Sequence, residues 1–484
     1  MKSVLRLLSV LAFLIAAGSA VADEALTFGQ VLQRVLDTDP SLQVAAMKVQ
    51  RARQENPRVE SQLGWALEGQ AGVARDTNSL LGTPTDRSDA SVNLDRKLAS
   101  GGSVGLGAGY TREDSGSTFS PSIPNPADST SVDLNYRLPL GQGKDNPDYH
   151  QGLVSAAAGV EIAEADWEAQ RDQLARKTAD LFFTAALTQA RLKSAERTIA
   201  RAERLKRYIR RNAALGIAEK KDRLQAEAQL RTQIAGHRRL QVDWEQQRTE
   251  LNRLMNHPWD AEFIPVLADS FVPVMEDFRK LLQEAEDNNS DLLRNRARLS
   301  QAEAAIARAR DAARNKMDVV LSVGNKTLSG NTSLGNINRS ERVGGVRLEY
   351  RYPLDKRGFD AEINQALLDR SIALREISSV RSDLRYNVSS LLAEIGAAQY
   401  ALEGYRLGLE SEKQKLREAE ERYRTGRTET DKLIQFESDF YLAELSLKQQ
   451  KIDLARKHTD LDILRGALWR TVAPSGTREG DGVQ

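Results

Sequence analysis

The residues best suited to chemistry are few in this chain and form no catalytic pattern. It has four histidines, without the spacing of metal ligands: His150, His237, His257 and His458. It has no cysteine, which excludes disulfides, thiolate zinc sites and iron–sulfur clusters. The run Gly105-x-Gly107-x-Gly109 lies in a strand-like alternation and indicates small residues of a strand, not a nucleotide loop. We therefore expect no enzyme activity, cofactor or metal.

Composition excludes further classes. The 484 residues include 69 Lys and Arg against 68 Asp and Glu, so a net charge of +1 provides no long-range attraction for nucleic acid. Length alone suggests about three globular domains of roughly 150 residues each. Only 6% of the residues are aromatic, which argues against three compact cores and favours an extended, helix-rich architecture.

The N-terminus, residues 1–22, has the pattern of a secretory signal peptide. Lys2 and Arg6 precede an apolar run from Leu7 to Ala17, and Ala20-Val21-Ala22 is a small-x-small cleavage site. The other interpretation is a buried N-terminal helix. Later residues include no apolar stretch long enough for a helical membrane span. Without a cysteine after the signal the mature chain is not a lipoprotein, so we expect a periplasmic, secreted or outer-membrane β-barrel protein.

Two copies of one unit follow each other, at 23–256 and 274–470. A shift of 250 superimposes Phe28 on Phe278, a shift of 214 superimposes Pro139-Leu140 on Pro353-Leu354, and a shift of 210 superimposes Gly216 on Gly426. The changing shift places extra residues in the first copy, between about 60 and 135. The segment 257–273 separates the copies, and 471–484 forms a tail.

Each copy combines a strand pattern with a long helical hairpin. Strands are expected at about 61–140 and 317–354, because apolar side chains such as Leu134 alternate with charged ones such as Asp133. After Pro139 and Pro353, spacings of four and three predict coiled-coil hairpins at about 150–256 and 359–470. The helix from 359 to 424 would be roughly 100 Å long. Charges elsewhere on these helices are interpreted as a solvated face.

The alternating strands fit a membrane β-barrel around a wet lumen, and also a soluble half-buried sheet. Two strand pairs per chain cannot close a barrel, and open edges are forbidden in lipid, so the barrel interpretation requires a homo-oligomer. The extra residues of the first copy predict one more hairpin, with strands around Val92-x-Leu94 and Val104 to Tyr110. Spacing leaves open whether this hairpin joins the barrel or lies above it.

From Leu26 to about Trp469 the chain resembles the outer-membrane efflux protein (TolC) family. The resemblance rests on Leu26-Thr27-Phe28 leading to Asp39-Pro40, and on two longer motifs: Gly216-x5-Asp222-x-Leu224-x-Ala226-x3-Leu230 and Tyr423-x2-Gly426-x4-Asp431-x-Leu433. It implies an α+β membrane protein, a homotrimer with one shared transmembrane β-barrel and a long α-helical periplasmic tunnel. The 257–273 segment and the chain ends would form an equatorial belt.

The resemblance also implies a gate. Gly216 and Gly426 would turn the helical hairpins at periplasmic tips, with Tyr423 and Asp222 bonding between neighbouring hairpins to hold the tunnel shut. Asp431 would form an acidic ring that binds divalent cations. For the two acids the alternative role is a helix N-terminal acid near the dipole. The second tip is expected to be one residue shorter than the first, and Ile434 leaves it without a second acidic ring.

The function implied is an outer-membrane exit duct of a tripartite efflux pump or a type I secretion system. Its partners would be outer-membrane lipid, a periplasmic adaptor and an inner-membrane pump or ABC exporter. The alternative is a non-conducting periplasmic coiled-coil scaffold, which accounts for the heptads but not for the lipid-type strands. Drug, metal, protein and polysaccharide substrates are not distinguished by sequence.

Overall fold

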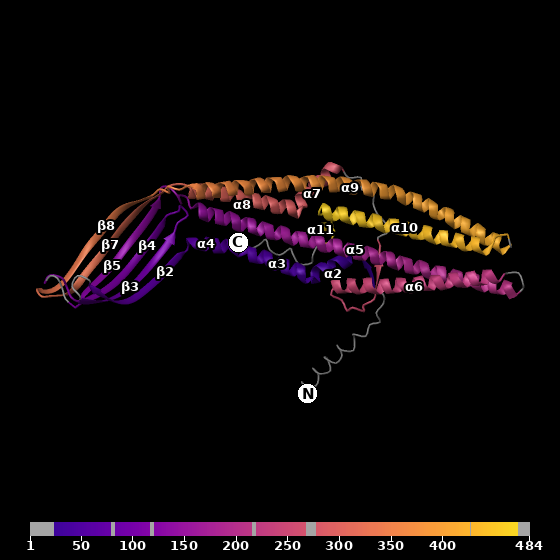
Figure 1. Cartoon of the computed structure of the whole chain (residues 1–484), viewed down its shortest axis with the longest axis horizontal. Coiled ribbons are helices and arrows are strands. Elements are labelled where there is room, and N and C mark those ends of the chain that lie inside the picture. The colour runs from indigo at the N-terminus through magenta and orange to yellow at the C-terminus, as the bar shows by residue number, and fades with distance from the viewer. Residues whose placement is uncertain are drawn as a thin grey trace, which may run out of the picture. The chain divides into compact units, whose positions relative to one another are not determined.

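A computed structural model describes residues 24–78, 83–116, 121–214, 219–267, 277–425 and 427–472 (Figure 1). The signal-peptide segment 1–22, most of the expected tail, Gly216 and Gly426 lie outside these residues. The chain forms two compact units. We call Ala46–Asp166 with Asp291–Ser379 the sheet unit, and Met1–Ala45, Trp167–Ser290 and Val380–Gln484 the helical unit.

The sheet unit contains one six-stranded antiparallel sheet, in the order β2-β3-β4-β5-β7-β8. Its strands are β2 (Trp65–Asn78), β3 (Thr83–Lys97), β4 (Ser103–Ser115), β5 (Ala127–Pro139), β7 (Lys316–Thr332) and β8 (Gly335–Arg351). The expected strand region began near 61, but Ser61–Leu63 forms a 3₁₀ turn. The extra hairpin, left open by sequence, is β3–β4 and lies inside the sheet.

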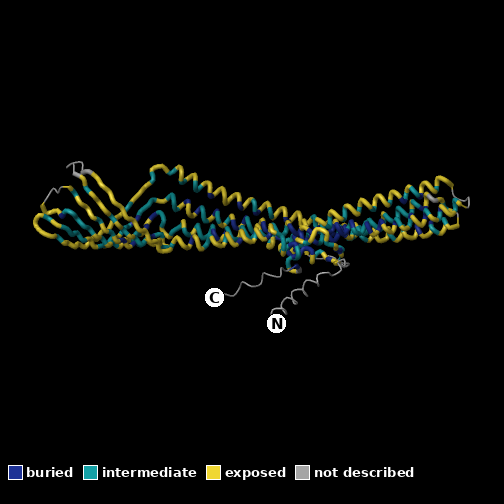
Figure 2. Tube along the Cα trace, turned by 90° about the horizontal axis from the view of Figure 1, so that it is seen from below, coloured by how far each residue is buried: buried dark blue, intermediate teal, exposed yellow. Residues whose placement is uncertain are grey.

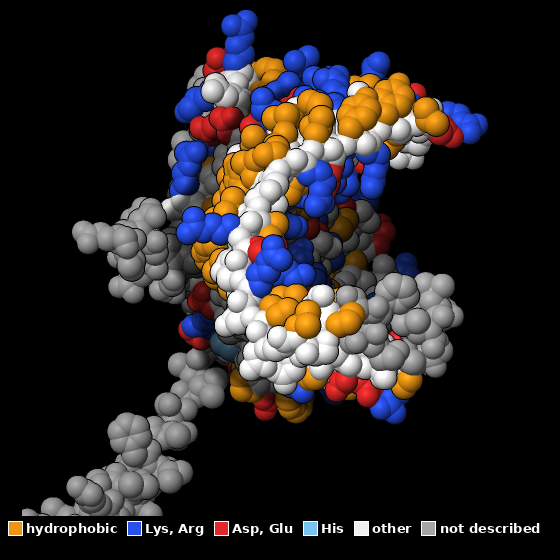
Figure 3. Space-filling model, turned by 90° about the vertical axis from the view of Figure 1, so that its left-hand side faces the viewer, with side chains coloured by type: hydrophobic (Ala, Val, Ile, Leu, Met, Phe, Trp, Pro, Cys, Tyr) orange, Lys and Arg blue, Asp and Glu red, His pale blue; other side chains and the backbone are white. Residues whose placement is uncertain are grey.

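One face of the sheet is apolar and exposed. A single row of side chains crosses the strands in register: Leu67, Leu94, Leu106, Leu134 and Val323. Leu67 is 72% exposed and Val323 66%, so none of the described residues covers this apolar band at these two positions. Figure 3 shows hydrophobic side chains gathered along the outer side of the curved strands.

The opposite face is polar, and the glycines of β4 shape it. A Cβ on Gly105 would lie 2.3 Å from Oδ1 of Asp95, and one on Gly107 would lie 2.9 Å from Oδ1 of Asp133. The acidic side chains of the neighbouring strands therefore lean over β4 because it has no side chains there. The small residues expected from sequence stand on this polar face.

Four long helices follow the strands: α5 (Pro147–Ala214), α6 (Lys220–Leu254), α9 (Arg357–Arg424) and α10 (Thr430–Leu464). Both α5 and α9 have 68 residues, and both α6 and α10 have 35. At 1.5 Å per residue a 68-residue helix is about 100 Å long. No helix in the described ranges has the length and apolar character needed to cross a membrane.

The heptad seams are buried along part of their length in the helical unit. On α5, Leu174, Thr178 and Ala185 are at most 6% exposed, and on α9 Leu384, Val388 and Ile395 are at most 3% exposed. Two polar residues interrupt the seam of α10, and both find partners on α9. Gln450 Nε2 donates to the carbonyl oxygen of Ala398 at 3.1 Å, and Lys457 pairs with Glu394.

The largest core of the helical unit collects segments that are distant in sequence. Strand β1 (Glu24–Thr27) pairs in parallel with β6 (Phe263–Val266), within the expected segment 257–273. Phe28 packs on Phe182 and Phe183, with ring centroids 5.8 and 5.6 Å away. Buried residues concentrate in this region (Figure 2). The shorter helices are α2 (Phe28–Thr38), α3 (Pro40–Arg53), α4 (Glu55–Glu60), α7 (Phe278–Asn288), α8 (Ser290–Ala312) and α11 (Leu468–Thr471).

Both Pro-Leu steps lie where a strand ends. Pro139 is the last residue of β5 and Pro353 follows β8 by two residues. After Pro139 the chain docks on the turn between β3 and β4: Asp145 N donates to Ser100 O at 3.0 Å. Gly101 has a φ of +85°, and a Cβ there would lie 1.8 Å from Gly143 O. The turn at Gly101 therefore requires glycine for two independent reasons.

We predict that Gly101→Ala destabilises the sheet unit. The left-handed backbone alone costs about 1–2 kcal/mol for an alanine, and the contact with Gly143 adds to it. Gly236→Ala on α6 is the control, because nothing lies within 4 Å of its Cβ and alanine gains about 0.5–1 kcal/mol in a helix. Thermal unfolding in detergent measures both; equal midpoints would contradict the assigned contact.

Candidate functional site at the helix tips

The tips of the two helical hairpins carry the residues expected to form a gate. Residues 215–219 connect α5 to α6, and 425–429 connect α9 to α10. The connections are thus equal in length, although Gly426 and Asp431 are one residue closer in sequence than Gly216 and Asp222. The difference lies inside the helices, because Asp222 is the third residue of α6 and Asp431 is the second residue of α10.

Both acids stand in the first turn of a helix. Asp222 belongs to a capping box: its Oδ2 accepts from Glu219 N at 3.0 Å, and the Glu219 side chain accepts from the Asp222 backbone. Asp431 is exposed in the first turn of α10, where the helix dipole favours a negative charge. A role near the helix dipole does not prevent a second role for Asp431, because this residue is exposed to solvent.

Tyr423 lies one residue before the end of α9, where the two hairpins pack together. Its ring is 5.4 Å from that of Tyr208 on α5 and tilted by 52°. Both rings border a small buried cluster formed by all four helices: Leu205, Ile209, Ala226, Leu416, Ala419 and Leu433. Ile434 also packs on this cluster, which explains why an apolar residue follows Asp431 by one turn.

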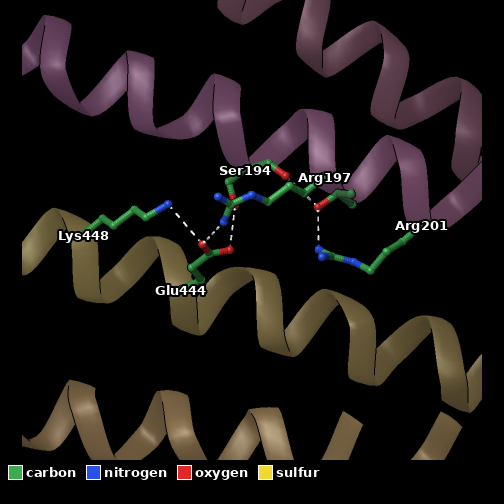
Figure 4. Close-up of polar contacts among 6 residues, drawn as sticks. Ser194, Arg197, Arg201, Glu444 and Lys448 are labelled. Atoms are coloured by element: carbon green, nitrogen blue, oxygen red, sulfur yellow. Dashed lines mark hydrogen bonds and ion pairs between the residues drawn. The ribbon is translucent and has the colours of Figure 1, made fainter. Parts of the chain in front are cut away.

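A polar cluster joins the first hairpin to the second further along the same helices (Figure 4). Glu444 of α10 accepts from Ser194 Oγ at 3.0 Å and from Arg197 Nη1 at 3.2 Å, both on α5. Lys448 Nζ donates to the same carboxylate at 3.1 Å. The Glu444 side chain is only 14% exposed, so these charge-assisted bonds are partly shielded from water. We call these four residues the Glu444 clamp.

Sequence reasoning missed the clamp because it assigned charges outside the heptads to a solvated face. A signal was present: Glu444 directly follows the seam residue Ala443 and precedes Lys448 by one turn. No cluster of three or more histidine or acidic side chains suited to a metal ion occurs in the described part of the chain.

The pKa values of two glutamates seven residues apart on α10 are shifted in opposite directions. Burial alone would raise the pKa of Glu444, but hydrogen bonds from Lys448 and Ser194, with the charge of Arg197, hold this pKa below its usual 4.5. Burial raises the pKa of Glu437, nearby Glu420 raises it further, and Arg201 and Arg204 only partly oppose this. Ionised Glu444 therefore stabilises the packed hairpins, whereas ionised Glu437 weakens them.

The chain is similar to known proteins both in sequence and in fold. The sequence model of the outer membrane efflux protein family matches residues 281–467. No curated protein matches the chain by sequence. Among solved structures, the outer-membrane channel OprN is similar with a TM-score of 0.68 and 17% identity, covering 91% of this chain and 89% of that one.

Two further channels have similar folds. VceC of Vibrio cholerae gives a TM-score of 0.63 at 14% identity, over 92% of this chain and 95% of that one. CmeC of Campylobacter jejuni gives 0.63 at 15% identity, over 91% and 85%. The chain thus has the fold of outer-membrane channels along nearly its whole length.

We predict opposite effects of one chemical change at the two glutamates. Glu444→Gln should destabilise the hairpins at pH 7 by about 1–3 kcal/mol, since it weakens bonds to charged groups. Glu437→Gln should be neutral or stabilising, because it removes a charge disfavoured by burial. Thermal unfolding of both variants measures the signs, and a shift in the same direction would contradict the assignment.

The pH dependence follows from the same shifts. Because folding lowers the pKa of Glu444, its stabilisation is present above the unfolded-state value near 4.5 and is lost as pH falls through the folded-state value. The deficit of Glu444→Gln should therefore shrink below pH 4.5. Glu437 has the opposite pH dependence, because folding raises its pKa. Its protonated form stabilises the folded protein fully below pH 4.5, and this stabilisation is lost as pH rises through the raised folded-state pKa.

Proposed function

We propose that this chain is a member of the outer membrane efflux protein family, whose model matches residues 281–467, and that it is the outer-membrane exit duct of a tripartite export system. The observation that carries the proposal is the two-faced sheet. One face exposes a continuous apolar band and the other is polar, the pattern of strands placed between lipid and a water-filled lumen.

The two edges of the sheet support a homo-oligomeric barrel. Strands β2 and β8 each pair on one side only among the described residues. An edge with unpaired N–H and C=O groups is not tolerated in lipid, so a further strand must cover it. A second copy of the chain supplies such an edge, and by resemblance to the family three copies close the barrel.

Exposed apolar side chains on α9 support the same assembly. Tyr386, Ala393, Tyr400 and Leu407 recur every seven residues and all are exposed, with Tyr400 at 88%. A seven-residue apolar repeat marks a seam for another helix. We propose that a neighbouring copy covers this stripe in the tunnel wall.

The gate belongs to the proposal as well. The helix tips open like an iris, Tyr423 and Asp222 bond across neighbouring hairpins in the closed state, and Asp431 contributes a ring of three carboxylates. The Glu444 clamp holds α5 against α10, so opening displaces the tips while this seam stays joined. A periplasmic adaptor and an inner-membrane pump or ABC exporter drive it.

The experiment is detergent extraction from outer membranes followed by planar-bilayer recording. A duct fractionates with the outer membrane and gives discrete conductance steps. A non-conducting periplasmic scaffold, the rival function, would be recovered in soluble periplasmic extract and would insert no channels.

We predict that Asp431→Ala raises single-channel conductance and weakens inhibition by divalent cations. Three carboxylates near one axis attract cations, and their removal abolishes that site. Glu410→Ala, an exposed acid on α9, should change neither quantity. Unchanged conductance and unchanged divalent inhibition in Asp431→Ala would refute the acidic ring.

We also predict that Tyr400→Glu weakens the oligomer, because it places a charge in an apolar helix seam. The temperature at which the trimer dissociates on a semi-native gel should fall. Arg406→Glu also adds negative charge to α9 but lies off the stripe, and should leave this temperature nearly unchanged. An equal effect of both variants would argue against the seam.

A further inference from the structure

The sheet receives unequal contributions from the two halves of the chain. The second half supplies one hairpin, β7–β8, whereas the first supplies β2 and β5 with the hairpin β3–β4 between them. This hairpin pairs along nearly its whole length on both sides. Its pairs with β2 run from Trp65↔Arg96 to Asn78↔Thr83, and its pairs with β5 run from Ser103↔Arg137 to Glu113↔Ala127. It is therefore part of the wall and not a loop above it.

The base of the hairpin is fixed to the rest of the sheet unit. Asp145 N donates to Ser100 O at 3.0 Å, and Asn146 Nδ2 donates to Leu98 O at 3.3 Å. The close approach of Gly101 to Gly143 makes the same junction tight. These contacts hold the hairpin at the level where the other strands meet the helices.

The hairpin also continues both faces of the sheet. Leu94 and Leu106 extend the apolar row between Leu67 and Leu134. On the other face, Asp95 and Gly105 extend the polar row. A strand pair with this alternation, bonded on both sides, has the same relation to lipid and lumen as its neighbours.

We infer that the β3–β4 hairpin widens the pore, so that three copies close a barrel of 18 strands. The inference rests on the proposed homotrimeric barrel, in which the β8 edge of one copy pairs with the β2 edge of the next. Strands about 4.8 Å apart and tilted by about 40° give a diameter of roughly 36 Å between opposite backbones. Four strands per chain would give only about 24 Å.

A barrel of 18 strands falls in the size class that leaves an open aqueous channel. The outer end of this duct therefore admits solutes of polymer size, and any tighter selection takes place elsewhere along the path. The polar face supplies carboxylate, amide and hydroxyl groups such as Asp133, Asn135 and Ser322, which suit a hydrated cargo and not an apolar one.

The test measures the width of the lumen from outside. Because the chain has no cysteine, Ser322→Cys on the polar face provides a single reactive thiol in β7. Intact cells or proteoliposomes are treated with maleimide-polyethylene glycols of increasing size. Val323→Cys, the adjacent residue on the apolar face, is the matched control and should resist these water-soluble reagents.

A variant lacking residues 83–115 supplies the comparison. Removing β3 and β4 leaves β2 and β5 to pair, because Ala71 and Thr130 occupy one row of the sheet. We expect Ser322→Cys in the full chain to react with polymers that no longer enter the shortened variant. An identical size limit in both, or exclusion from the full chain of every polymer wider than the 12-strand lumen, would overturn the inference.

If the shortened variant fails to fold, the size limit of the full chain alone decides. A second experiment tests the proposed contact between the β2 edge of one copy and the β8 edge of the next. Leu67→Cys on β2 is combined in turn with Gly344→Cys, Val346→Cys or Leu348→Cys on β8. One of these double variants should form disulfides between chains and give covalent trimers. Equal labelling of Ser322→Cys and Val323→Cys would refute the membrane barrel itself. Labelling of Ser322→Cys alone, with trimers but a narrow limit, would refute only the wider pore.

Discussion

The unpaired backbone along β2 and β8 is the constraint on which the architecture depends. N–H and C=O groups need hydrogen-bond partners, and in the described residues these two strands have partners on one side only. An exposed, long and apolar strand edge invites pairing with another chain. The proposed assembly satisfies that pairing with a further copy, and it places the apolar band of Leu67 and Val323 toward lipid and the polar face of Asp133 toward the lumen.

The long helices likewise have one set of surfaces paired within the chain and another left exposed. Contacts within one chain combine buried heptad residues with specific polar bonds, such as Gln450 to the carbonyl of Ala398 and the Glu444 clamp. The stripe around Tyr400, in contrast, is apolar and uncovered. Directional bonds thus fix how the two hairpins of one chain fit together, while the stripe around Tyr400 offers only less directional hydrophobic contact.

Periodicity predicted most of this fold, because strands and coiled coils repeat every 2 and 3.5 residues over long segments. The alternating and heptad segments lie within the six strands of the sheet and the four long helices, but the strands extend beyond the alternation, as where β7 runs to Thr332 and β8 begins at Gly335. The contact between Gly101 and Gly143 was not predictable, since it depends on a positive φ and on residues distant in sequence. Nor could sequence spacing show that the one-residue difference between the two tips lies inside the helices, which begin after Glu219 and Glu429.

The equal lengths of α5 and α9, and of α6 and α10, limit how such a chain evolves. One inserted residue turns every later side chain by about 100° around its helix. An insertion on α5 alone would carry Arg197 away from Glu444 and break the match with the other hairpin. Seven residues restore the face to within about 20°. Length changes in these helices are therefore tolerated in whole heptads and in both halves together, so the two hairpins lengthen or shorten in discrete steps.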